Sequence, residues 1–167
     1  MWRELPAANR RWVVVNALLA TALINVVVNV AIDILIVAGH GEIPLWEPPL
    51  VRPSTAWTLM GTLFLLPLIT SVLATRAVRH DLEAGSLERV NVSPRLWAAH
   101  EAPARRGAAL GLTALVLVAP PLLIVMTLLD FQDLSHTRFI AYQTAFAVLL
   151  GLVVTPLVAI RAMGDGG

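Results

Sequence analysis

The sequence contains no cysteine, and this absence removes several kinds of chemistry at once. Disulfides, thiolate metal sites, cysteine nucleophiles and dithiol redox centres are all excluded. Lysine is also absent, so all twelve basic residues are arginine. Together with the abundant alanine, valine, leucine and glycine, this bias indicates a GC-rich bacterial genome. The formal net charge of +1 gives no reason to expect nucleic acid as a partner.

Charged side chains of both signs are scarce. They make up 14% of the 167 residues, whereas 57% of the residues are hydrophobic. A soluble domain is typically about 25% charged. The chain therefore has too few polar groups to cover a soluble surface, and we treat residues 1–167 as a single membrane domain.

Four stretches carry no Asp, Glu, Arg, Lys or His, and each is 21 to 23 residues long. They are Trp12–Ile32, Pro53–Thr75, Gly107–Leu129 and Phe139–Ile160. About 20 helical residues cross a hydrocarbon core roughly 30 Å thick. Lipid cannot satisfy backbone hydrogen bonds, so such segments must be helical. The sequence predicts an all-α, four-helix membrane bundle of two antiparallel hairpins, with spans at about 12–37, 54–76, 107–129 and 138–161.

The first span begins with basic residues, as a cleaved signal peptide does. Its apolar region is much longer than the roughly 7–15 residues of a signal peptide. No convincing small-x-small cleavage pattern follows it. We therefore expect a retained signal anchor.

The orientation follows from the distribution of arginine, because cytoplasmic loops of membrane proteins are enriched in basic residues. Ten arginines fall on one predicted side of the membrane. They are Arg3, Arg10, Arg11, Arg76, Arg79, Arg89, Arg95, Arg105, Arg106 and Arg161. The other side has only Arg52 and Arg138. The sequence thus predicts a bacterial inner-membrane protein with both termini in the cytoplasm.

The two largest loops differ in character. The first outer loop, rich in glycine and proline, is expected to be irregular, with Leu45 and Trp46 on the membrane surface. The inner loop, residues 77–106, is expected to contain a short amphipathic helix, Arg95–Ala102, on the inner membrane surface. Its candidate residues for contact with lipid head groups are Arg95, Trp97, Arg105 and Arg106. The alternative is a solvated connector.

The clearest candidate for function lies in the first span, where polar residues recur every four positions. They are Thr21, Asn25, Asn29 and Asp33. Each step of four advances 40° beyond a full turn, so these side chains follow one face of the helix. A charged group facing lipid at mid-membrane costs about 2.5–3.5 kcal/mol. This face should therefore meet protein or water.

Two interpretations of this face remain open. It could line a polar path or ligand site together with Thr62 of the second span and Gln143 of the fourth. It could instead only form hydrogen bonds between helices, worth about 0.6–2 kcal/mol each. Asp33 lies near the outer end, where it could pair with Arg52, Arg138 or His40.

Proline interrupts three of the four spans, at Pro67, Pro120-Pro121 and Pro156. Each removes a backbone donor and can bend the helix, and the proline pair is the strongest candidate for a kink. The spacing of Gly107 and Gly111 would allow close helix packing.

Metal and catalytic chemistry have little support in the sequence. The outer acidic and histidine residues lack ligand spacings such as H-E-x-x-H. No phosphate-binding loop or nucleophile elbow is present. We therefore predict no catalytic residue, metal or cofactor.

Three functions are compatible with these observations, and the lipid bilayer is the partner common to all. The first is a small-solute transporter, channel or ligand-binding bundle that uses the polar face of the first span, as a homo-oligomer. The second is a non-catalytic subunit or assembly factor of a larger membrane complex. The third is a lipid-acting enzyme with its titratable groups in the inner loop.

Overall fold

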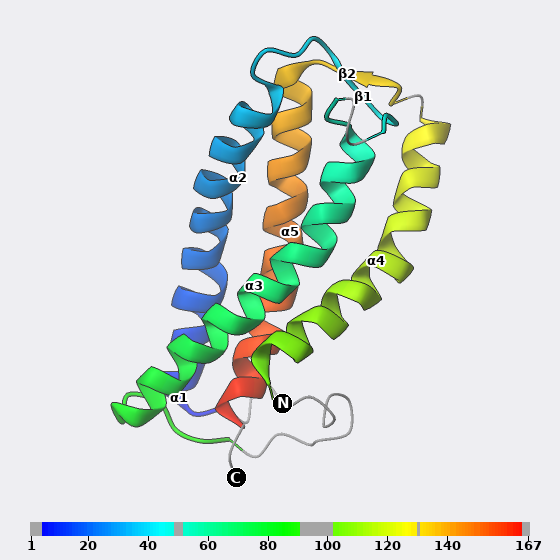
Figure 1. The fold of residues 1–167 in the computed structure, drawn as a ribbon. Helices are drawn as coiled ribbons and strands as arrows, with labels where there is room; N and C mark the ends of the chain where they lie inside the picture. The colour runs from blue at the N-terminus through cyan, green and yellow to red at the C-terminus, as the bar shows by residue number, and fades with distance from the viewer. Residues whose placement is uncertain (1–4, 49–51, 91–101, 130, 165–167) are drawn as a thin grey trace.

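The fold is described from a computed structural model, for residues 5–48, 52–90, 102–129 and 131–164. The first helical run comprises α1 (Ala7–Trp12), a π-helical segment η2 (Val13–Ala20) and α2 (Thr21–Val37). The other long helices are α3 (Thr55–Glu83), α4 (Pro103–Leu128) and α5 (His136–Met163). All four runs are long and apolar enough to cross a membrane. The predicted all-α architecture with four such helices is confirmed (Figure 1).

The helices extend past the charge-free spans, mostly at one end of the bundle. The first run begins at Ala7, α3 continues to Glu83, and α4 begins at Pro103. A charged residue is costly only within hydrocarbon, so a helix can continue into water beyond the span. The helix α3 ends at Glu83, and Gly85 follows two residues later with a positive φ of 71°, which suits glycine. Residues 91–101 lie outside the described residues, and so does most of the expected surface helix Arg95–Ala102.

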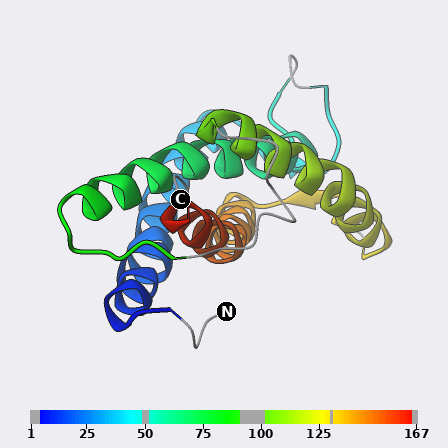
Figure 2. The ribbon, with the colours of Figure 1, turned by 90° about the horizontal axis from the view of Figure 1, so that it is seen from below.

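The central helix of the bundle is α5. It packs against α2 and α3, and α3 also packs extensively against α4. Figure 2 shows α5 flanked by the first helical run and by α3 when the bundle is viewed along its length. In the apolar window of α5, 50% of residues are buried, compared with 11% in the first helical run. Among the described residues, the extensive helix pairs are α3 with α4, α3 with α5 and α2 with α5, whereas α2–α3 and α4–α5 make few backbone contacts.

A small antiparallel bridge ties the loop between α2 and α3 to the loop between α4 and α5. Strand β1 (Ile43–Pro44) pairs with β2 (Asp133–Leu134), and the Leu45 amide donates to the Gln132 carbonyl at 2.7 Å. This pairing turns the Leu45 side chain into the core, where it is 1% exposed. The expectation that Leu45 lies on a membrane surface is therefore wrong, whereas Trp46 is exposed.

Polar contacts hold the opposite end of the bundle, where α1 and the end of α5 lie together (Figure 1). Trp12 Nε1 donates to Asp81 Oδ2 at 2.6 Å, which joins α1 to α3. The buried Asn9 side chain pairs with the backbone of Glu88, donating to its carbonyl at 2.7 Å and accepting from its amide at 3.1 Å. The Val90 amide donates to the Met163 carbonyl. The segment after α3 is thus fixed to α1 and to the last turn of α5.

Glycine and proline determine how α4 lies on α3. A side chain at Gly107 or Gly111 would collide with the α3 backbone, because their Cβ positions lie 2.7 Å from Leu68 Cα and 2.6 Å from Phe64 O. The predicted close packing at this glycine pair is confirmed. Pro120 and Pro121 lie inside α4, which changes direction along its length in Figure 1.

Candidate functional site

The polar face of α2 looks toward α5. Asn25 lies against Gly151 of α5 so closely that a Cβ on this glycine would overlap the Asn25 Nδ2 atom. The methyl group of Thr21 lies 3.4 Å from the same position. The absence of a side chain at Gly151 therefore lets the asparagine amide enter the helix interface. This face meets protein, as the cost of a polar row in lipid requires.

Two members of the row bind their own helix. Asn29 Nδ2 donates to the Asn25 carbonyl at 2.8 Å, one turn back. Thr21 Oγ1 donates to the Asn16 carbonyl at 3.1 Å, five residues back. This longer spacing coincides with the end of the π-helical segment η2. Thr21 and Asn29 thus satisfy their donors locally.

Asp33, the last member of the row, is the most deeply buried, with 1% of its surface exposed. Thr144 of α5 is the side chain that approaches its carboxylate. Neither Asp33 Oδ2 nor Thr144 Oγ1 makes a hydrogen bond of standard geometry within the described structure. Two polar atoms are therefore buried together at this point of the α2–α5 interface.

The expected basic partners of Asp33 are engaged elsewhere or make no ion pair with it in the described part of the chain. Arg52 pairs with Glu47, with Nε and Oε2 3.2 Å apart. His40 Nδ1 lies 3.1 Å from the carbonyl oxygen of Ala38. Asp33 is thus a buried carboxylate without a salt bridge among the described residues.

The residue just before Thr144 on α5, Gln143, points to the other neighbouring helix, α3. Its Nε2 donates to Thr62 Oγ1 of α3 at 3.0 Å. The Thr62 hydroxyl in turn donates to the Thr58 carbonyl at 3.0 Å, so it acts as both donor and acceptor. Gln143 is fully buried, and its Oε1 has no hydrogen-bond partner in the described structure.

Gln143 and Thr144 are consecutive in α5, and they place polar groups in its interfaces with α3 and with α2 at the same depth in the bundle. We name Asp33, Thr62, Gln143 and Thr144 the outer polar site, where outer refers to the end of the bundle that carries β1 and β2. Three of its four members were predicted from the sequence. Thr144 was missed, as was Gly151, although they lie seven residues apart and so fall on one helix face. That spacing of small residues was the available signal.

The chemistry of the outer polar site is dominated by oxygen atoms. Asp33 Oδ2, Gln143 Oε1 and Thr144 Oγ1 are all buried and make no hydrogen bond of standard geometry in the described structure, although the Thr144 side chain lies beside the Asp33 carboxylate. Asn25 Nδ2, farther along α2, is buried in the same way. Buried polar atoms in proteins are nearly always paired, and an exception indicates water, an ion or a ligand. The site could accept hydrogen bonds from a bound solute or hold a positive charge.

The described residues contain no group of three or more His, Asp or Glu side chains placed to hold a metal ion. Of the expected head-group residues, Arg105 is exposed at the start of α4. Arg106 is 3% exposed, so it is not presented to a membrane surface as expected. The remaining two, Arg95 and Trp97, lie outside the described residues.

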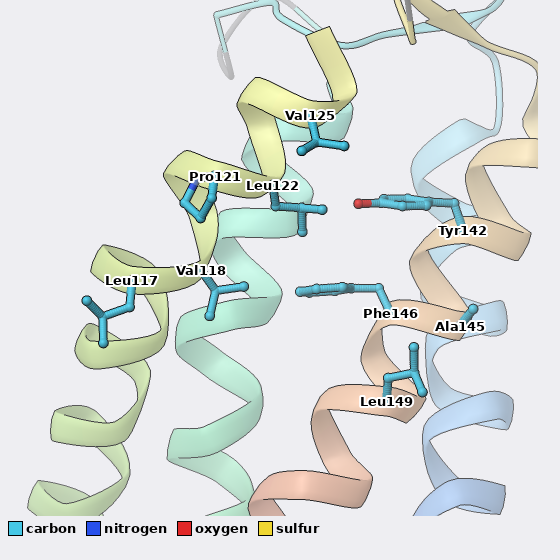
Figure 3. Close-up of a pocket in the computed structure, with 9 residues that line it drawn as sticks. All are labelled: Leu117, Val118, Pro121, Leu122, Val125, Tyr142, Ala145, Phe146 and Leu149. Carbon is cyan, nitrogen blue, oxygen red and sulfur yellow. The ribbon is translucent and has the colours of Figure 1, made fainter. Parts of the chain in front are cut away.

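Two apolar grooves flank the proline pair of α4. The larger has a volume of about 690 Å³ and lies between α4 and α5, where the rings of Tyr142 and Phe146 face α4 (Figure 3). The smaller, about 530 Å³, lies on another side of α4 and includes Trp46 and Met60. Neither groove includes a member of the outer polar site.

Comparison with known proteins does not assign the chain to a family. No protein-family model, no curated protein and no solved structure matches it.

Proposed function

We propose that the chain spans the bacterial inner membrane four times with both termini in the cytoplasm. The four apolar helices and the excess of ten arginines over two support this placement. Each helix must then keep its polar groups away from lipid. The burial of Asp33 between α2 and α5, and of Gln143 between α5 and α3, agrees with this requirement.

Within that membrane we propose that the bundle binds and conducts a small solute that is positively charged or donates hydrogen bonds. The observation that carries this proposal is the buried Asp33 carboxylate without a salt bridge in the described structure. Ionisable residues inside membrane helices are costly and usually serve ion or solute pathways. Gln143 and Thr144 supply further oxygen atoms beside it, which suits the desolvation of such a solute.

The proposal is tested with purified protein in liposomes. Their swelling is followed after external addition of ammonium, potassium, guanidinium or glycerol. At least one of these should enter faster with the wild-type protein than with Asp33→Asn, which keeps the shape of the side chain and removes its charge. Asp133→Asn, the same change at an exposed residue of β2, should behave as wild type. Equal swelling in all three proteins for every solute would refute the proposal.

A second function, as a subunit of a larger membrane complex, is favoured by Asn16. This residue is exposed on the π-helical segment, one turn beyond Trp12 in the apolar stretch. An exposed amide in a lipid-facing helix is unfavourable, and amides commonly bind neighbouring helices. π-Helical turns also occur frequently at functional sites. We propose that Asn16 contacts a helix of another polypeptide.

Native mass spectrometry after mild detergent extraction tests this second function. A stoichiometric partner or a second copy should accompany the wild-type chain, and Asn16→Leu should release it. Leu19→Ala removes an exposed apolar side chain in the same segment and serves as the control. A wild-type chain extracted only as a monomer would contradict the subunit function and leave the solute-binding proposal intact.

A further inference from the structure

We infer that the groove between α4 and α5 is a lipid-binding site. It takes one acyl chain of an anionic phospholipid, whose phosphate binds Arg138. The site is distinct from the outer polar site and depends only on the proposed placement in a membrane. Four features of the groove carry the inference: its lining, its shape, its depth and the charge above it.

The lining excludes a polar ligand. Apolar side chains or their apolar parts make up almost the entire wall, and these are Leu117, Val118, Pro121, Leu122 and Val125 of α4 with Tyr142, Ala145, Phe146 and Leu149 of α5. The Tyr142 hydroxyl already donates to Met126 Sδ at 3.3 Å. Small-molecule sites of about 300–1,000 Å³ normally contain a few oriented polar groups. A groove of about 690 Å³ without them suits a hydrocarbon chain.

The shape of the groove is produced by rigid elements. The proline pair bends α4, and Figure 3 shows its outer half standing apart from α5, with side chains from both helices directed into the gap. Tyr142 and Phe146 stack with ring centroids 6.4 Å apart and planes at 14°. The two rings project from α5 toward α4 one above the other, and their edges form one side of the groove (Figure 3).

The depth of the groove favours a lipid over a partner helix. From Arg138 to Leu149 the helix advances eleven residues (149 − 138), or about 16 Å at 1.5 Å per residue. This length is about half of a hydrocarbon core roughly 30 Å thick. The groove therefore covers one leaflet, whereas a spanning helix would need a contact surface through both leaflets.

Arg138 supplies the charge that selects the head group. It lies four residues before Tyr142, and side chains with this spacing are neighbours on one helix face. Arg138 is exposed and takes part in no hydrogen bond or ion pair within the described residues. Guanidinium groups bind phosphate through paired hydrogen bonds. A phosphate held at Arg138 would place the attached acyl chain above the groove opening.

The test is native mass spectrometry of the full-length protein, equilibrated in detergent with equal amounts of phosphatidylglycerol and phosphatidylcholine. Wild-type protein should retain one phosphatidylglycerol in preference to phosphatidylcholine. Ala145→Phe fills the groove and should lose this lipid. Its control, Leu112→Phe, enlarges an exposed α4 residue outside the groove and should retain it.

The head group is tested by Arg138→Gln, which should lower the preference for phosphatidylglycerol several-fold while leaving the groove open. The control Arg52→Gln removes the other outer arginine and should leave the preference unchanged. Equal retention of the two lipids by the wild type, or equal retention by Ala145→Phe and Leu112→Phe, would overturn the inference. A dimer that Ala145→Phe dissociates would assign the groove to a second copy and overturn it as well.

Discussion

The Asn25 side chain of α2 occupies the space that a side chain on Gly151 of α5 would need. An amide therefore enters the α2–α5 interface where the facing helix has only a backbone hydrogen. This relationship explains how a row of polar residues can be accommodated within an apolar bundle. It also makes Gly151 a sensitive position.

Gly151→Ala should destabilise the protein by about 1–3 kcal/mol, the usual cost of overpacking. The new methyl group would displace the Asn25 amide, so the loss should shrink when Asn25→Ala is also present. Thermal unfolding of the purified protein in detergent measures both variants. Gly61→Ala is the matched control, since no atom lies within 4 Å of its Cβ position. Equal stabilities of Gly151→Ala and Gly61→Ala would contradict the proposed packing.

Gly111→Ala should be more damaging than Gly151→Ala. Its Cβ would lie 2.6 Å from the carbonyl oxygen of Phe64, and a backbone atom cannot rotate away as a side chain can. The α3–α4 contact would have to open, with a cost beyond the roughly 1–3 kcal/mol of ordinary overpacking. The same unfolding experiment measures it, with Leu112→Ala as an exposed control on α4. A stability like that of the control would show that α4 is not held closely against α3.

The Gln143–Thr62 hydrogen bond should contribute about 0.6 kcal/mol, and at most about 1.7 kcal/mol, as is typical between membrane helices. A double-mutant cycle with Gln143→Leu and Thr62→Val isolates this coupling. The cycle is needed because Gln143→Leu also removes the unpartnered Oε1 atom and its desolvation cost. Strict additivity of the two substitutions would show that the residues do not interact.

Asn9→Leu should release the segment that follows α3. The substitution removes both hydrogen bonds to the Glu88 backbone, each worth about 0.5–1.5 kcal/mol. Hydrogen exchange of the Glu88 and Val90 amides should become faster, while exchange in α5 should change little. The control is Arg10→Ala, which alters an exposed neighbour on α1. An unchanged rate of hydrogen exchange at the Glu88 amide would show that Asn9 does not hold this segment in place.

The four helices could be predicted because hydrocarbon imposes a simple requirement on sequence. A charge-free run of sufficient length must be helical, and Pro53–Thr75 satisfies this condition without reference to any other segment. The polar row could also be predicted once the first span was known to be helical, because the spacing of Asn25, Asn29 and Asp33 places them on one face of the helix.

The identity of the facing helix could not be predicted in this way. Asn25 and Asp33 meet α5, yet nothing within residues 12–37 distinguishes α5 from α3 as the neighbour. The choice of α5 as neighbour depends on small residues far along the chain, such as Gly151, which leaves room for the Asn25 side chain. It also depends on the β1–β2 pairing, next to which Leu45 is buried. Asn9 was missed because a single asparagine before a hydrophobic span carries no periodic signal.

The most direct test of the account is the position of Asp33 relative to Thr144 in the membrane. Because the natural chain has no cysteine, the pair Asp33→Cys and Thr144→Cys can be oxidised in native membranes without background disulfides. This pair should cross-link rapidly within one chain. The pair Leu35→Cys and Thr144→Cys should not, since Leu35 is 75% exposed on another face of α2. Cross-linking through position 35 but not through position 33 would place the polar row outside the bundle and contradict the proposed site.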